Sequence, residues 1–199
     1  MMPRLLIIGG LVLAALWLVA EDFAVDPRAV EDRMLLAELN REEGLVFRQH
    51  NAREHGVVVL ANGMQVKVLH HGAGRIPASD EWVSVHYQGW HVDGRLFDST
   101  HRLGLPGIVP IEQTIPGWQQ LLTSVPEGTR ARIVLPAELA YGQAGSGRIG
   151  PDETLIFEIE LLGIVPPTSF SDPRQLEPLQ QPVPGLVMAA NPGSAGSRK

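Results

Sequence analysis

The chain contains no cysteine, and this absence excludes several kinds of chemistry. Disulfide bonds, thiolate zinc sites, cysteine nucleophiles and lipid attachment through an N-terminal cysteine all require that residue. Positive charge is scarce as well, because 16 lysines and arginines stand against 22 aspartates and glutamates, for a net charge of −6. Proteins that bind nucleic acid usually carry a basic surface. Nucleic acid is therefore not an expected partner.

Motifs of metal, nucleotide and covalent catalysis are also missing from the sequence. The seven histidines form no H-E-x-x-H pattern or other close ligand spacing, so no metal site is predicted. Residues Gly145–Gly150 match the letters of G-x-G-x-x-G, but a dinucleotide site needs a strand before this motif and a helix after it. Here the motif follows a turn at Tyr141-Gly142 and leads through Pro151 into a strand, which predicts a surface loop. We expect any catalysis to use no nucleophile, metal or cofactor.

The length and the remaining composition fit one globular domain with an extension at each end. The chain has 199 residues, of which 44% are hydrophobic and 19% charged. These values exclude disorder of the whole chain and are enough for one hydrophobic core.

Residues 1–23 read as a signal anchor or a signal peptide. Arg4 precedes an uncharged run of 16 residues, Leu5–Ala20, which would span about 24 Å as a helix at 1.5 Å per residue. Cleavage after Ala20 would put Leu18 where a small residue is preferred, so the uncleaved anchor is favoured over the cleaved signal. The sequence therefore predicts an exported, periplasmic protein held in the inner membrane by residues 5–20, with Arg4 on the inner side.

Residues 166–199 differ from the rest of the chain in composition. They hold seven of the 16 prolines and end in glycine, serine and alanine, with no helical or strand periodicity. This composition predicts an extended, disordered tail, and a docking peptide is the less favoured alternative.

Residues 24–56 are predicted to form a helical arm. Asp26 can cap a helix that starts at Pro27. Gly44 interrupts the apolar stripe, which predicts either two helices or one helix with a weak point. The stripe is too short for a coiled coil, so we expect a spacer docked on the domain, and a monomer or weak dimer. Its members are Leu35, Leu36, Leu39, Val46 and Phe47.

Residues 57–165 have the texture of a small antiparallel sheet with one helix, and so of the α+β class. Asp93-Gly94 is a strong hairpin signal between two strands. Pro116 suits the first turn of a helix that would run to Val125. The predicted strands are Met64–His70, Trp82–Trp90, Arg95–Asp98, Thr129–Leu135 and Thr154–Ile164.

A set of aromatic residues and one carboxylate stands out on separate predicted elements of this domain. Taken singly, each aromatic residue fits a plain core. Asp98, however, follows Phe97 in an apolar setting, where a carboxylate is costly unless it is paired, and His101 and Arg102 are its nearest candidate partners. Tyr141 precedes the glycine-rich loop, and loops often carry functional sites. The set comprises Tyr87, Phe97, Asp98, Trp118, Tyr141 and Phe157.

Four motifs at these residues resemble the FKBP-type peptidyl-prolyl cis-trans isomerases in order and spacing over residues 57–164. They are VHYQGWHVDGRLFDST (Val85–Thr100), IPGW (Ile115–Trp118), AYG (Ala140–Gly142) and TLIFEIELL (Thr154–Leu162). The segment Gly44–Gly74 is similar to the corresponding segment of the bacterial macrophage-infectivity-potentiator-like members, which are exported and often dimeric.

The resemblance implies a half-open antiparallel sheet wrapped around one short helix, with an apolar pocket that accepts an X-Pro peptide. Tyr87, Phe97 and Phe157 would form its walls and Trp118 its floor. The backbone N–H of Ile115 would hold the substrate carbonyl, Tyr141 would donate its hydroxyl, and Asp98 would orient and polarise the site.

Three further residues are expected to bind substrate, and three positions depart from the usual family pattern. Val109 replaces a frequent aromatic residue, which thins that wall, and Thr114 replaces the usual valine. Ile149 remains a wall residue. Gly150 stands where the family usually has proline, in a loop one residue shorter, which loosens the backbone behind Ile149.

The function that the resemblance implies is isomerisation of X-Pro bonds in exported proteins, which assists their folding. A non-catalytic chaperone or assembly module that binds proline segments in the same pocket is the alternative. The implied partners are proline-containing polypeptides and the macrolide inhibitors of the family, and the implied chemistry uses no cofactor and no metal.

Overall fold

The structure, a computed structural model, describes residues 26–102 and 104–166. The predicted membrane segment Leu5–Ala20 and all but the first residue of the predicted tail lie outside these ranges. The chain divides into two units between Leu35 and Leu36, so the first unit contributes only residues 26–35 to the description. This division falls inside the helical arm, and residues 36–56 group with the domain.

The arm forms one α-helix, α2 (Pro27–Asn51). The side chain of Asp26 accepts a hydrogen bond from the backbone N–H of Arg28 at 3.0 Å, which confirms the predicted cap. Of the two alternatives at Gly44, the break into two helices is wrong, because α2 runs through this residue without interruption. Within the described ranges, no helix is both long and apolar enough to cross a membrane.

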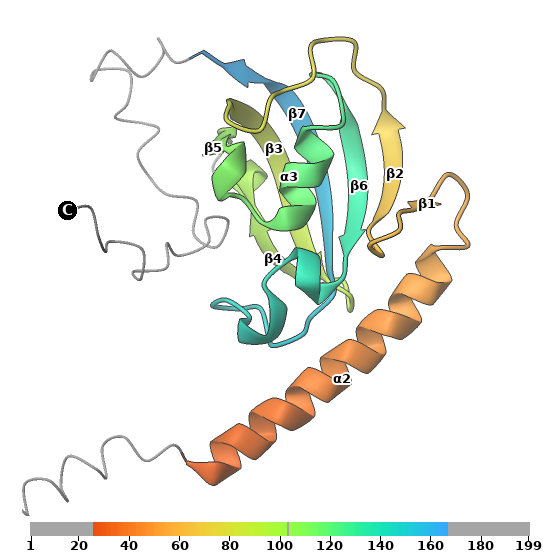
Figure 1. The fold of residues 1–199 in the computed structure, drawn as a ribbon, viewed down its shortest axis with the longest axis vertical. Coiled ribbons are helices and arrows are strands. Elements are labelled where there is room, and N and C mark those ends of the chain that lie inside the picture. The colour runs from red at the N-terminus through yellow and green to blue at the C-terminus, as the bar shows by residue number, and fades with distance from the viewer. Residues whose placement is uncertain (1–25, 103, 167–199) are drawn as a thin grey trace, which may run out of the picture. The chain divides into compact units, whose positions relative to one another are not determined.

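Seven strands form one sheet in which every neighbouring pair is antiparallel. The order is β1-β2-β6-β7-β3-β4 (Figure 1). β5 pairs with the beginning of β3, and β4 pairs with its end. The predicted α+β class is confirmed. The strands are β1 (Val58–Val59), β2 (Gln65–His70), β3 (Trp82–His91), β4 (Leu96–Ser99), β5 (Gly107–Pro110), β6 (Arg130–Leu135) and β7 (Leu155–Val165).

The long alternating strands and the hairpin were predictable, and the shortest strands were not. Gly94 adopts a positive φ of 86° in the β3–β4 turn, as the Asp-Gly signal predicts. Strands β1 and β5 were missed because two to four residues carry too little periodicity, whereas the equally short β4 was marked by the turn before it. Four 3₁₀ turns complete the domain: η1 (Thr100–Arg102), η2 (Ile111–Gln113), η3 (Ala137–Leu139) and η4 (Gly142–Ala144).

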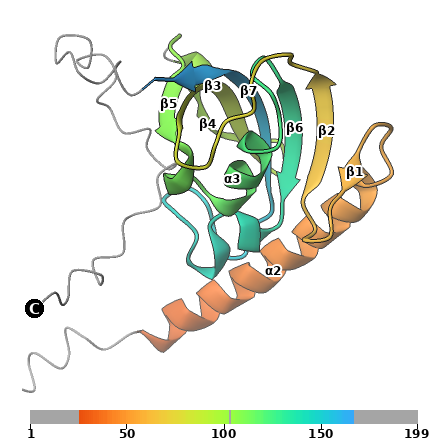
Figure 2. The same ribbon diagram turned by 45° about the horizontal axis from the view of Figure 1, so that its top comes forward.

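One short helix, α3 (Pro116–Leu122), lies across the sheet (Figures 1 and 2). It ends three residues earlier than predicted, and Pro116 occupies its first turn as expected. Trp118, Leu121 and Leu122 are buried between helix and sheet. A Cβ atom on Gly117 would lie 2.4 Å from a methyl group of Leu135, so glycine permits the close approach of α3 to β6. The observed architecture is the expected sheet wrapped around a short helix.

Most of the arm's apolar stripe stays exposed to solvent. Leu36, Leu39 and Val46 are 44%, 51% and 62% exposed. The buried residues of α2 are instead Gly44 and Asn51. Asn51 donates a hydrogen bond to Gln65 at 2.7 Å, and Gln65 donates in turn to the arm's backbone. Polar groups and a glycine therefore contribute to the contact beside the half-buried Phe47, and a hydrophobic pattern cannot reveal them.

Candidate active site

Four aromatic rings, from β3, β4, β7 and α3, contact one another in a row. Trp118 contacts Tyr87 edge-on at a ring-centroid distance of 5.1 Å and Phe157 at 5.5 Å. Phe157 in turn contacts Phe97 at 5.6 Å. A Cβ atom on Gly89 would lie 2.6 Å from the Phe97 ring, so only glycine leaves space for this ring. Edge-to-face contacts of this kind fix the rings in defined orientations.

Asp98 projects from β4 beside these rings and is engaged through both oxygens. The Tyr87 hydroxyl donates to Oδ2 at 2.6 Å, and the backbone N–H of Ser99 donates to Oδ1 at 2.8 Å. The partners expected from sequence proximity, His101 and Arg102, are not its partners. The pairing of β4 with β3 brings Tyr87 to Asp98 across the sheet, which sequence proximity does not reveal.

Both tyrosines of the predicted site are held in the neutral, hydrogen-donating form. Burial raises the pKa of Tyr87 far above its usual range, and the hydrogen bond to Asp98 raises it further. Burial and the nearby charge of Asp98 raise the pKa of Tyr141 to about 12. Asp98 therefore acts on the ionisation of both hydroxyl groups.

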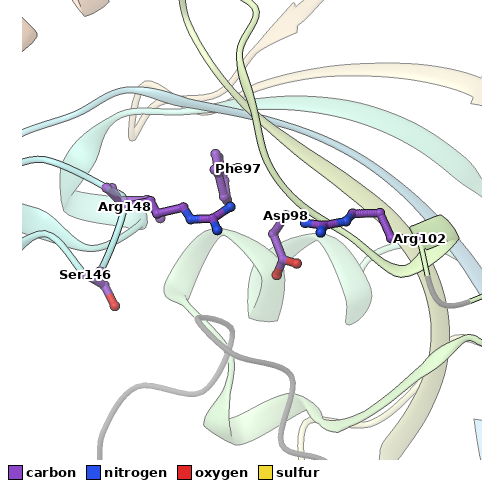
Figure 3. Close-up of a pocket in the computed structure, with 7 residues that line it drawn as sticks. Phe97, Asp98, Arg102, Ser146 and Arg148 are labelled. Carbon is purple, nitrogen blue, oxygen red and sulfur yellow. The ribbon is translucent and has the colours of Figure 1, made fainter.

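A cavity of about 350 Å³ opens beside this cluster. Of the predicted site residues, Phe97, Asp98 and Ile149 line it, and the remaining lining comes from η1 and the glycine-rich loop. Arg102 and Arg148 reach toward Asp98 from opposite sides of this space (Figure 3). Tyr87, Trp118 and Phe157 are fully buried behind it, and Tyr141 is half-buried.

The other predicted residues that we expected to bind substrate, Val109, Thr114 and Ile115, are buried and do not line the cavity. Val109 and Ile115 are buried in the cluster with Tyr87 and Trp118. Thr114 is buried and donates its hydroxyl to the carbonyl of Ile111 at 2.7 Å. The backbone N–H of Ile115, directly ahead of α3, donates no hydrogen bond within residues 26–102 and 104–166.

Comparison with known proteins gives a consistent result. Residues 74–162 match the family described as FKBP-type peptidyl-prolyl cis-trans isomerase. The chain is 41% identical over 129 residues to "Outer membrane protein MIP" of Legionella longbeachae, covering 64% of this chain and 55% of that protein. It is 43% identical over 124 residues to the "FKBP-type 22 kDa peptidyl-prolyl cis-trans isomerase" of Escherichia coli K12, covering 62% and 60%. The matches thus span little more than half of these relatives.

Solved structures cover more of both chains. FkpA from Escherichia coli is similar with a TM-score of 0.63 at 29% identity, over 79% of this chain and 82% of that chain. A peptidyl-prolyl cis-trans isomerase from Pseudomonas syringae is 32% identical with a TM-score of 0.60, over 65% of this chain and 96% of that chain. The chain belongs to the FKBP-type peptidyl-prolyl cis-trans isomerase family. Its relatives named Mip and FkpA place it in the Mip-like subfamily of that family.

The glycine-rich loop of this FKBP domain is a tight hairpin. Backbone hydrogen bonds join Ser146 and Ile149 in both directions, at 3.0 and 2.9 Å, and leave Gly147 and Arg148 at the turn. The motif leads directly to β7, and Ser146, Gly147 and Arg148 are exposed, so the prediction of a surface loop is confirmed.

Two side chains that the sequence analysis did not single out brace this loop of the FKBP domain. Glu153 accepts a hydrogen bond from the backbone N–H of Gly150 at 2.8 Å and also bonds the ring of His91, which in turn contacts the Phe97 ring. Asn40 of the arm donates to the carbonyl of Pro151 at 2.8 Å. The freedom expected from Gly150 is thereby offset. Within the described ranges, no three histidine, aspartate or glutamate side chains group as metal ligands.

The raised tyrosine pKa values predict a loss of stability in strong base. Below pH 10 both tyrosines are neutral whether the protein is folded or unfolded, so they make their full contribution to the free energy of unfolding. Between pH 10 and about 12 the unfolded state ionises and the folded state does not, so stability falls with rising pH. The slope should be up to about 1.4 kcal/mol per pH unit for each tyrosine. Urea unfolding of the protein and of Tyr141→Phe between pH 9 and 11.5 measures how the free energy of unfolding changes with pH. Equal slopes in the two proteins would show that Tyr141 does not contribute to this fall.

Proposed function

We propose that the protein is a peptidyl-prolyl cis-trans isomerase that acts on X-Pro bonds of exported polypeptides and assists their folding. The observation that carries this proposal is the cavity beside Phe97 and Asp98, backed by the rings of Tyr87, Trp118 and Phe157. Phe97 and Ile149 give this cavity an apolar surface of defined shape, and no group within it needs to transfer a proton.

The physical basis is the loss of amide resonance at the top of the barrier. The planar X-Pro bond has partial double-bond character, and rotation costs about 18–20 kcal/mol. Water stabilises the charge-separated planar amide more than the twisted form, whose nitrogen is amine-like. An apolar pocket shaped for the twisted form reverses this preference. A 10⁴-fold acceleration requires only about 5.5 kcal/mol.

The residues divide into those that shape the pocket and those that hold the peptide. Phe97 and Ile149 supply apolar walls, and the buried Trp118 supports them from behind. The N–H of Ile115 and the hydroxyl of Tyr141 are donors for substrate carbonyl groups, and Asp98 fixes the neighbouring Tyr87. The buried indole N–H of Trp118 has no partner within residues 26–102 and 104–166. An unpaired buried donor of this kind costs about 1–3 kcal/mol of stability.

Two substitutions test the site. Phe97→Tyr places a hydroxyl in the apolar wall, and Asp98→Leu removes the carboxylate that holds the Tyr87 hydroxyl. Each should lower kcat/KM about tenfold or more, while the free energy of unfolding changes by about 1 kcal/mol or less for Phe97→Tyr. NMR exchange spectroscopy on X-Pro peptides with residues 21–199 measures the rate. Full activity in both variants would show that the pocket is wrongly assigned.

The same assay separates catalysis from binding alone. A protein that binds proline peptides but does not accelerate their exchange would be a chaperone or assembly module. The geometry favours the enzyme, because the cluster of rings is complete and the loop behind Ile149 is braced by Glu153 and Asn40. Proline-containing polypeptides and the family's macrolide inhibitors are the ligands that we propose for this pocket, and a monomer or weak dimer is the proposed state.

Export and anchoring are proposed from the sequence and one relative. The name "Outer membrane protein MIP" places that relative in the cell envelope. Leu5–Ala20 is an uncharged run behind Arg4, with no good cleavage site. We expect the protein to remain in membranes washed with carbonate and to keep its first twenty residues by mass spectrometry. A soluble protein that lacks those residues would contradict the anchor.

A further inference from the structure

Two arginines flank the cavity of the proposed isomerase site. Arg102 ends the 3₁₀ turn η1, and Arg148 occupies the corner of the hairpin between Ser146 and Ile149. Both line the cavity together with Asp98. Figure 3 shows their side chains extending toward Asp98 from opposite sides. The two guanidinium groups therefore face the space that a bound peptide would occupy.

Neither arginine has a carboxylate partner among the residues that the structure describes. Within residues 26–102 and 104–166, neither forms an ion pair, and Asp98 is already engaged by Tyr87 and Ser99. Elsewhere in the domain, Arg75, Arg95 and Arg130 all pair with a carboxylate. The cavity thus carries two positive charges and one negative charge on a chain whose net charge is −6.

The backbone on each side of the cavity is held in place. Thr100, two residues before Arg102, bonds the backbone N–H of Tyr87 at 3.0 Å. Arg148 lies between the two hydrogen-bonded partners of a closed hairpin. Side chains on fixed backbone lose less entropy when a ligand orders them than side chains on a mobile loop do.

We propose that Arg102 and Arg148 make the site selective for peptides with an acidic side chain next to the proline, either directly before it or directly after it. A guanidinium group binds a carboxylate through paired N–H donors, and it keeps its charge at all physiological pH values. The proposal rests on the isomerase activity proposed above and specifies its substrate class.

The test compares peptides that differ only in charge beside the proline. Two series carry Glu, Gln or Lys, one series directly before the proline and the other directly after it. In at least one series kcat/KM should be about three- to fivefold higher for Glu than for Gln, as expected for exposed ion pairs, and lowest for Lys. The preference should shrink when the salt concentration rises from about 0.02 M to about 1 M.

The double variant Arg102→Gln/Arg148→Gln should lose the preference for Glu over Gln. A matched control is Arg53→Gln/Arg132→Gln, which changes the net charge equally at two exposed residues outside the cavity lining and should keep the preference. Equal rates for Glu and Gln in both series, or an unchanged preference in the Arg102/Arg148 variant, would overturn the proposal. Failure to catalyse exchange of any peptide would instead refute the proposed isomerase function.

Discussion

Replacement of Trp118 by alanine is expected to lower the free energy of unfolding by about 3–5 kcal/mol and to abolish most isomerase activity. The indole ring is fully buried and contacts both Tyr87 and Phe157, so its removal leaves a cavity that these rings cannot fill without losing their orientation. Urea unfolding gives the loss of stability, and peptide exchange measured well below the unfolding midpoint gives the loss of activity.

Trp118→Phe is the matched control for this variant. It keeps an aromatic ring and removes the indole N–H, which has no partner within the described part of the chain. The loss of the unpaired donor offsets part of the lost volume, so we expect a cost of no more than about 1 kcal/mol. If Trp118→Ala lowered the free energy of unfolding as little as Trp118→Phe, Trp118 would not support the pocket. Leucine is intermediate in size, so Trp118→Leu should lower the free energy of unfolding by an amount between those of the other two variants.

Gly44→Ala is expected to destabilise the protein, although alanine is the better helix former. Alanine gains about 1 kcal/mol over glycine in a helix interior. At this position its Cβ would lie 2.2 Å from Oγ1 of Thr154 and 2.7 Å from the Thr154 Cβ atom. Rotation of the threonine side chain moves the first atom and not the second, so the arm must shift. Overpacking typically costs about 1–3 kcal/mol, and we expect a net loss of about 1–2 kcal/mol.

The shift should also reach the proposed active site, because the arm holds the loop that follows Ile149. Asn40 bonds the carbonyl of Pro151, and Arg41 pairs with Asp152 at 2.7 Å. We therefore expect KM to rise more than kcat falls in Gly44→Ala. Combination with Thr154→Ala removes the closer of the two clashing atoms, so the double variant should be more stable than the sum of the single changes predicts. Strict additivity would contradict the contact.

Local features of the fold could be predicted because they depend on residues close together in the chain. Alternation over Trp82–Trp90 and Thr154–Ile164 predicted β3 and β7. Asp93-Gly94 predicted the turn between β3 and β4, and Pro116 predicted the start of α3. The resemblance to the FKBP family then supplied candidate pocket residues that periodicity could not distinguish from core. Their catalytic roles stay predictions, which the assays above test.

The sequence by itself determined the class of the fold, the course of its main strands and the absence of cysteine chemistry. Only the tertiary structure decided that Asp98 bonds Tyr87 and that the arm docks through Gly44 and Asn40. It also decided that two arginines flank the cavity, neither of which forms an ion pair with any residue that the structure describes. The reason is physical: strand and turn preferences act over a few residues, whereas Asn40 and Pro151 are 111 positions apart. Contacts at that separation depend on how the whole domain packs, and a polar or glycine contact leaves no hydrophobic pattern in the sequence.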